Sequence, residues 1–129
     1  MIVVDSAAIV DSLSCVDGTG DLRKRLATEE LHAPALLDFE VVSALRGLTL
    51  AGHLSQPRAH DLLTDYNDLT LCRWAFEDSL RRRAFQLRNN ISAYDAAYVV
   101  LAETLECPLV TRDARLARST GHIAQITVY

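Results

Sequence analysis

The chain has 129 residues, 50% of them hydrophobic and 23% charged, which indicates one ordinary globular domain, residues 1–129, and excludes extensive disorder. No stretch reaches the ~20 apolar residues of a membrane span, and the N-terminus lacks the basic segment of a secretory signal, so we expect a cytoplasmic protein without a membrane partner. The net charge is −4, from 17 acidic and 13 basic residues, which argues against nonspecific nucleic-acid binding.

Apolar patterns predict strands and helices that alternate along the whole chain. We expect strands at 2–4, 32–34, 69–74, 108–111 and 124–128, and helices at 6–13, 21–27, 35–51, 55–67, 77–88, 92–105 and 112–119. The clearest helix, 35–51, has an apolar stripe of Leu37, Val41, Ala44 and Leu48. This alternation favours an α/β fold with a mainly parallel sheet covered by helices on both faces.

Three cysteines are present, Cys15, Cys72 and Cys107. They are odd in number and far apart, so they fit neither a disulfide framework nor a Cys-x-x-Cys metal site. We expect all three to be small buried apolar residues in a reducing compartment.

Acidic residues stand where strands end or beside apolar helix faces. Asp5 follows the first strand directly, and Asp113 follows the fourth by two residues, where it would face the same way as Thr111 if the strand continues. Glu40 flanks the stripe of the long helix, and Asp95 begins a helix one turn before Val99. Sites in parallel sheets form at the carboxyl ends of strands, so these four carboxylates could converge on Mg²⁺ or Mn²⁺.

Each acid also has a purely structural interpretation. Asp5 and Asp113 could cap helices, and Asp95 could complete a capping box with Ser92. Glu40 could favour the dipole of its helix. Asp38, about 200° around the helix from Glu40, should face solvent. Spacing alone leaves the metal site and these structural roles both open.

Four segments together resemble a known family, the PIN-domain ribonucleases, and within them the VapC-type toxins of bacterial toxin–antitoxin pairs. The segments are IVVDSAAIV at 2–10, PALLDFEVVSALRG at 34–47, ISAYDAAYVVLAETL at 91–105 and PLVTRDARLAR at 108–118. Each motif is weak alone, but their order, spacing and four acids are specific, and the resemblance covers essentially the whole chain.

The resemblance implies a three-layer α/β/α sandwich and an endoribonuclease that depends on Mg²⁺ or Mn²⁺. The family's catalytic and metal-binding acids fall on Asp5, Glu40, Asp95 and Asp113, and its supporting polar residues fall on Ser6 and Thr111. Water would be the nucleophile, leaving a 5′-phosphate and a 3′-hydroxyl. Some relatives carry another acid after the last motif, where this chain has Arg115 and Arg118. The resemblance therefore leaves undecided whether this chain has a second metal position.

Partners follow from the same resemblance. It implies a cognate antitoxin that inserts a segment into the acidic groove, and a homodimer for which the helices between residues 35 and 67 are candidates. Arg112 and Arg115 neighbour Asp113 and are our candidates for RNA phosphate contacts, whereas a solvated helix face is the alternative for the arginines as a group.

Other functions are weighed against the nuclease. A phosphoacceptor receiver domain needs a lysine after a late strand, and the single lysine, Lys24, lies early in the chain. A phosphatase of the haloacid-dehalogenase type needs a second Asp at position 7, which is Ala7. The remaining alternative is a catalytically silent PIN fold that binds RNA or protein.

Overall fold

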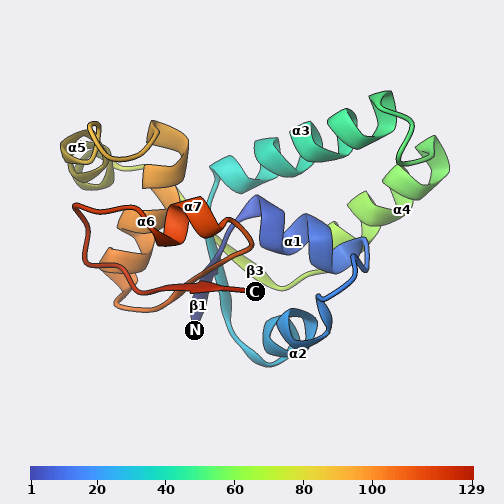
Figure 1. Cartoon of the computed structure of the whole chain (residues 1–129), viewed down its shortest axis with the longest axis horizontal. Coiled ribbons are helices and arrows are strands. Elements are labelled where there is room, and N and C mark those ends of the chain that lie inside the picture. The colour runs from blue at the N-terminus through green and yellow to red at the C-terminus, as the bar shows by residue number, and fades with distance from the viewer.

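Five short parallel strands form the centre of the computed structural model, which describes residues 1–129 (Figure 1). They are β1 (Ile2–Val4), β2 (Leu31–Pro34), β3 (Leu71–Trp74), β4 (Leu109–Thr111) and β5 (Ile126–Val128). Their order in the sheet is β3-β2-β1-β4-β5, with every neighbouring pair parallel. The chain leaves β1 on one side and later returns on the other, so the direction of winding reverses between β1 and β4.

Seven helices cover this sheet on both faces. They are α1 (Ser6–Leu13), α2 (Gly20–Thr28), α3 (Leu36–Leu50), α4 (Gln56–Asn67), α5 (Asp78–Gln86), α6 (Ala93–Leu105) and α7 (Ala114–Ala117). Figure 1 shows α1 to α4 together on one side of the strands and α5 and α6 on the other, with the α3–α4 hairpin projecting outward. The predicted three-layer α/β/α sandwich is therefore confirmed.

The core forms around β1 and α6. All three residues of β1 are fully buried, and α6 is buried continuously from Ala96 to Ala102. A central parallel strand is covered on both faces, so its residues form an apolar run without alternation. α6 packs against β1, β2 and β4 on one side and against α5 on the other, which explains why it is apolar almost all round.

The ends of several elements follow from side-chain capping. Asp5, Ser55 and Ser92 each accept a hydrogen bond from a backbone amide in the first turn of α1, α4 and α6, respectively. The observed β3 and β5 begin two residues later than predicted, at Leu71 and Ile126, and α7 is a single turn. These short edge elements have few apolar residues to define their limits.

The prediction that all three cysteines are buried is wrong for two of them, and the prediction for Asp38 is incomplete, since its side chain is 44% exposed but also bound within the fold. Cys107 is buried as expected, but Cys15 and Cys72 are exposed, and all three thiols are free. Asp38 does not simply face solvent: it accepts hydrogen bonds from the Tyr66 hydroxyl at 2.6 Å and from Arg73 Nε at 2.9 Å. Asp38 therefore connects α3 to α4 and β3. No helix of the fold combines the length and apolar character that a membrane crossing requires.

Candidate active site

The four predicted acids gather at the carboxyl edge of the sheet. Asp5 directly follows β1, Asp113 lies two residues beyond β4, Glu40 lies in the second turn of α3, and Asp95 lies in the first turn of α6. Glu40 and Asp113 both raise the pKa of Asp5, and Asp95 raises the pKa of Glu40. The four carboxylates are therefore within electrostatic reach of one another, at the edge where the winding reverses.

Asp5 is the most deeply buried acid of the group, only 8% exposed. Its Oδ1 accepts from the backbone N–H of Ala8 at 2.8 Å, and its Oδ2 accepts from the hydroxyl of Thr111. Burial is the main cause that raises the pKa of Asp5 to about 6, and these two hydrogen bonds only partly offset it. Asp5 thus caps α1 and also presents a charge that is costly to keep at neutral pH.

Thr111 connects two of the acids. Its hydroxyl donates to Asp5 and accepts from the backbone N–H of Asp113 at 2.9 Å. The strand ends at Thr111, so Asp113 is placed by this turn and not by strand alternation. Thr111 is fully buried, so its side chain fixes the position of Asp5 relative to the segment that carries Asp113.

Glu40 is held on one side by Ser6. The Ser6 hydroxyl donates to Glu40 Oε2 at 3.2 Å, whereas Oε1 is buried and has no hydrogen-bond partner. Burial raises the pKa of Glu40, and the nearby Tyr98 and Ser6 hydroxyls partly counteract this effect. An unpaired buried carboxylate oxygen is unfavourable unless a cation or donor approaches it.

Asp113 and Asp95 differ in what they contact. Asp113 caps α7 through the backbone N–H of Arg115 and also binds the Arg115 guanidinium, with Nη2 3.0 Å from Oδ2. The Arg115 hydrogen bond lowers the pKa of Asp113. The side chain of Asp95 makes no hydrogen bond or ion pair, although its backbone N–H donates to Ser92. Only the Ser92 half of the predicted capping box is formed.

Arg112, predicted as a phosphate contact, forms a partly exposed ion pair with another residue of the chain. Its Nε lies 2.8 Å from Oδ2 of Asp11 on α1. Arg115 is highly exposed and turned toward Asp113. Both arginines lie beside the acidic cluster, and each is paired with a carboxylate.

The acidic cluster has the donor chemistry that suits a hard divalent cation. All its ligands would be oxygens, and the unpartnered Glu40 Oε1 and the buried Asp5 carboxylate would both be stabilised by a positive charge. In their present rotamers, no three acidic, histidine or cysteine side chains converge on one point. The residues therefore fit the ion by type, and their side chains would have to rotate to hold it together.

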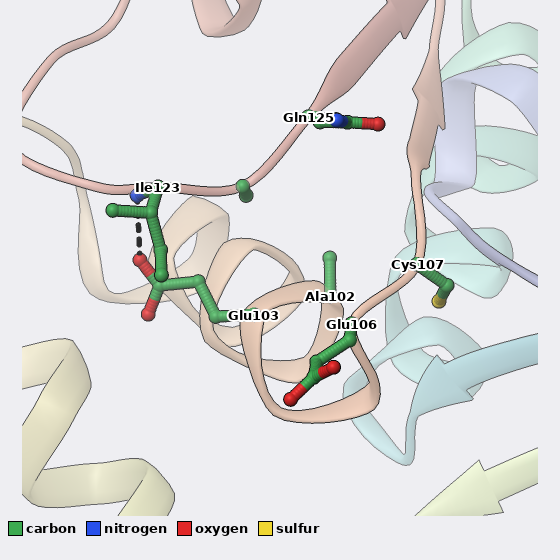
Figure 2. A pocket seen from close by; sticks show the side chains of 7 residues that line it. Ala102, Glu103, Glu106, Cys107, Ile123 and Gln125 are labelled. Carbon is green, nitrogen blue, oxygen red and sulfur yellow. Dashed lines mark hydrogen bonds between the residues drawn. The ribbon is translucent and has the colours of Figure 1, made fainter.

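A separate hollow of about 250 Å³ lies away from this cluster, between the end of α6 and the segment that leads into β5 (Figure 2). Glu103 borders it, but its carboxylate binds Arg83 and the backbone N–H of Ile123, the bond drawn in Figure 2. This hollow contains none of the predicted site residues.

Tyr98 is one residue whose place in the site the sequence did not indicate. Its side chain belongs to the core and is only 2% exposed. Its hydroxyl, however, is buried beside Glu40 without a hydrogen-bond partner. One signal in the sequence could have indicated this position. Tyr98 follows Asp95 by three residues, which places both side chains on the same face of the helix.

Comparisons with known proteins identify the family of the chain. The family model of the PIN domain matches residues 2–121. Ribonuclease VapC12 of Mycobacterium tuberculosis is 37% identical over 126 residues, covering 98% of this chain and 97% of that protein. Ribonuclease VapC9 of the same organism is 39% identical over 128 residues, covering 99% and 98%.

The fold also matches solved structures. A toxin–antitoxin complex from Klebsiella pneumoniae superposes with a TM-score of 0.68 at 15% identity, covering 99% of this chain and 97% of that one. At such low identity the match bears on the fold alone. The profile match and the two near-full-length relatives decide the family: the chain belongs to the PIN-domain family, in the group that contains the VapC ribonucleases.

Proposed function

We propose that this protein is a Mg²⁺- or Mn²⁺-dependent endoribonuclease that acts as the toxin of a toxin–antitoxin pair. The observation that carries the proposal is the grouping of Asp5, Glu40, Asp95 and Asp113 at the carboxyl edge of the sheet, with one carboxylate oxygen buried and unpaired. Two relatives of nearly the same length that are named ribonucleases support the reaction class.

The chain's own residues would divide the work as follows. Asp5, Asp95 and Asp113 would hold the ion, and Glu40 would bind it through water or complete a second position. A divalent cation there would lower the pKa of a water and neutralise charge on the phosphate. Thr111 keeps Asp5 in place, and Ser6 orients Glu40. Because water is the nucleophile, a substrate with a 2′-deoxy nucleotide at the cleaved position should retain some cleavage.

Arg115 and Arg112 are the proposed substrate contacts. If Asp113 bound an ion, its carboxylate would be less available to Arg115, and the Arg115 guanidinium could bind an RNA phosphate. Arg112 keeps its ion pair with Asp11 and adds positive charge beside the cluster.

The proposed partners are an antitoxin protein and a second copy of the chain. A solved structure of the same fold that is a toxin–antitoxin complex supports the first. The second would use the α3–α4 hairpin, where Phe39, Val42 and Leu50 are exposed. We place the action in the cytoplasm, where the RNA substrate is found.

A catalytically silent PIN fold is the second candidate, favoured by the ion pair that occupies Asp113. Cleavage of total RNA by the purified protein separates the two. The nuclease should make discrete cuts with Mg²⁺ or Mn²⁺ that EDTA abolishes. Asp5→Asn, shown by circular dichroism to be folded, should make none. Cuts that survive Asp5→Asn, or no cuts by the natural chain, would contradict the nuclease.

A further inference from the structure

Two buried polar atoms at the acidic cluster lack hydrogen-bond partners. One is Oε1 of Glu40, on α3, and the other is the hydroxyl of Tyr98, on α6. The first can only accept a hydrogen bond when the carboxyl is ionised, and the second can donate one. A buried donor and a buried acceptor without partners are each unfavourable, and both penalties disappear if the two atoms bond to each other.

The surroundings of the two atoms favour this pairing. The other oxygen of Glu40, Oε2, is already bound by the Ser6 hydroxyl at 3.2 Å. After burial, the effects that most raise the pKa of Tyr98 come from Glu40, so the two side chains are neighbours. Tyr98 lies one turn after Asp95 on the same face of α6, which points its ring toward the cluster.

We propose that Tyr98 is a positioning residue whose hydroxyl donates to Oε1 of Glu40 and, together with Ser6 on Oε2, fixes the orientation of this carboxylate in the working site. This inference rests on the proposed nuclease function, because it assigns Tyr98 a role through Glu40. With a hydroxyl on each oxygen, Glu40 presents its remaining lone pairs to the pocket in one orientation. The orientation of the Glu40 carboxylate is then fixed before the ion and the substrate bind, so this side chain need not reorient during the reaction.

The test compares Tyr98→Phe with a matched control, Tyr66→Phe. Tyr66 is also a buried tyrosine, 7% exposed, but its hydroxyl donates to Asp38 at 2.6 Å and not to Glu40. Both changes remove one oxygen and preserve the ring. Calorimetric titration with Mn²⁺ measures ion binding without requiring cleavage. Steady-state cleavage of an RNA oligonucleotide that the natural chain cuts separates kcat from KM, and thermal unfolding reports stability.

We expect Tyr98→Phe to raise the Kd for Mn²⁺ about tenfold and to lower kcat by a similar factor, the size expected when a hydrogen bond to a charged group is lost. KM and the unfolding temperature should change little. Tyr66→Phe should lower the unfolding temperature but leave kcat and Mn²⁺ binding unchanged. In a Glu40→Ala background, Tyr98→Phe should have no further effect on Mn²⁺ binding, because Glu40→Ala already removes the acceptor of the proposed hydrogen bond.

Three results would overturn the inference. The first is a Tyr98→Phe protein that binds Mn²⁺ like the natural chain. The second is a loss of ion binding that Tyr66→Phe reproduces through lower stability. The third is an undiminished effect of Tyr98→Phe in the Glu40→Ala background. If the natural chain binds Mn²⁺ but cuts no RNA, the proposed function fails, and the titrations still decide the role of Tyr98.

Discussion

At the scale of single residues, Asp5 shows how one side chain can serve both fold and site. It caps α1 through the Ala8 amide, which favours folding, yet its carboxylate is buried near Glu40 and Asp113. An ionised group in this environment destabilises the folded chain unless a cation neutralises it. The burial of Asp5 is therefore unfavourable for stability and useful for binding an ion.

This conflict gives a prediction for the ion-free protein. Burial raises the pKa of Asp5 from 3.8 to about 6. Above pH 6 the charge on Asp5 therefore lowers the free energy of unfolding by about 3 kcal/mol. Asp5→Asn keeps an acceptor for the Ala8 amide and removes this charge. We therefore expect Asp5→Asn to be more stable than the natural chain at pH 7.5 in EDTA, measured by urea unfolding with fluorescence of the single tryptophan, Trp74.

The pH dependence provides the control. Well below pH 3.8 the carboxyl is neutral in both the folded and the unfolded chain, so the difference between the two proteins should vanish. As the pH rises toward 6, the unfolded chain loses its proton first, and the natural chain loses stability relative to Asp5→Asn. A variant that is less stable at pH 7.5, or a difference that is constant with pH, would contradict this account.

At the scale of elements, the sequence predicted the central parts of the fold better than its edges. Every strand and helix was predicted, because buried runs such as Ile2–Val4 and caps such as Ser92 leave local signals. The pairings of Asp11 with Arg112 and of Asp38 with Tyr66 were not predicted, since they join residues far apart in sequence. The four acids could be named as site candidates because each lies in a motif that the sequence shows locally. The position of Tyr98 against Glu40 depends instead on how α6 packs.

The ion pair between Asp11 and Arg112 joins α1 to the segment after β4 and yields a second prediction. Asp11→Asn removes the negative charge that neutralises Arg112, whereas Arg112→Ala removes the positive charge of the guanidinium. In an Asp5→Asn background in EDTA, Arg112→Ala should weaken RNA binding and reduce its salt slope by about one, and Asp11→Asn should strengthen binding.

Fluorescence anisotropy of a labelled RNA at several salt concentrations measures both effects. Arg23→Ala, an exposed arginine on α2 without an ion pair, serves as the control for simple loss of charge. Equal weakening by Arg23→Ala and Arg112→Ala would show that Arg112 contributes only to the overall charge.

A third prediction concerns the attachment of α5 to α6. Glu103 accepts from Arg83 Nε and Nη2, both at 2.9 Å, and from the backbone N–H of Ile123 at 2.9 Å. The Arg83 hydrogen bonds lower the pKa of Glu103, so its stabilising effect is present above the pKa of the unfolded chain and is lost in acid. Glu103→Gln should cost about 1.5–3 kcal/mol at pH 7, measured by urea unfolding, and progressively less below pH 4.

Glu106→Gln is the matched control, because Glu106 borders the same hollow in Figure 2 and forms no ion pair. It should leave the free energy of unfolding unchanged. If Glu106→Gln destabilises the chain as much as Glu103→Gln does, the effect comes from the hollow and not from the Arg83 pair.

At the scale of the whole molecule, the projecting α3–α4 hairpin sets the shape of the surface. The chain exposes 7433 Å², more than the ~6,800 Å² expected for a compact monomer of its mass. Three large apolar side chains on α3 are exposed, namely Phe39 by 76%, Val42 by 56% and Leu50 by 71%. Val42 and Leu50 also border a hollow of about 240 Å³ between α3 and α4. An apolar surface of this kind is typical of a site that contacts another protein.

This surface carries the last prediction, that the chain forms a homodimer through the α3–α4 hairpin. Leu50→Glu places a charge in the contact, which must lose its water when the copies associate. We expect the natural chain to sediment as a dimer at micromolar concentration and Leu50→Glu to sediment as a folded monomer. Ile123→Glu changes an apolar residue that is 84% exposed and borders the hollow between α6 and the segment before β5. This variant should leave the dimer intact. A natural chain that stays monomeric, or equal dissociation by both variants, would exclude the hairpin as the dimer contact, and this apolar face would then be left to the antitoxin.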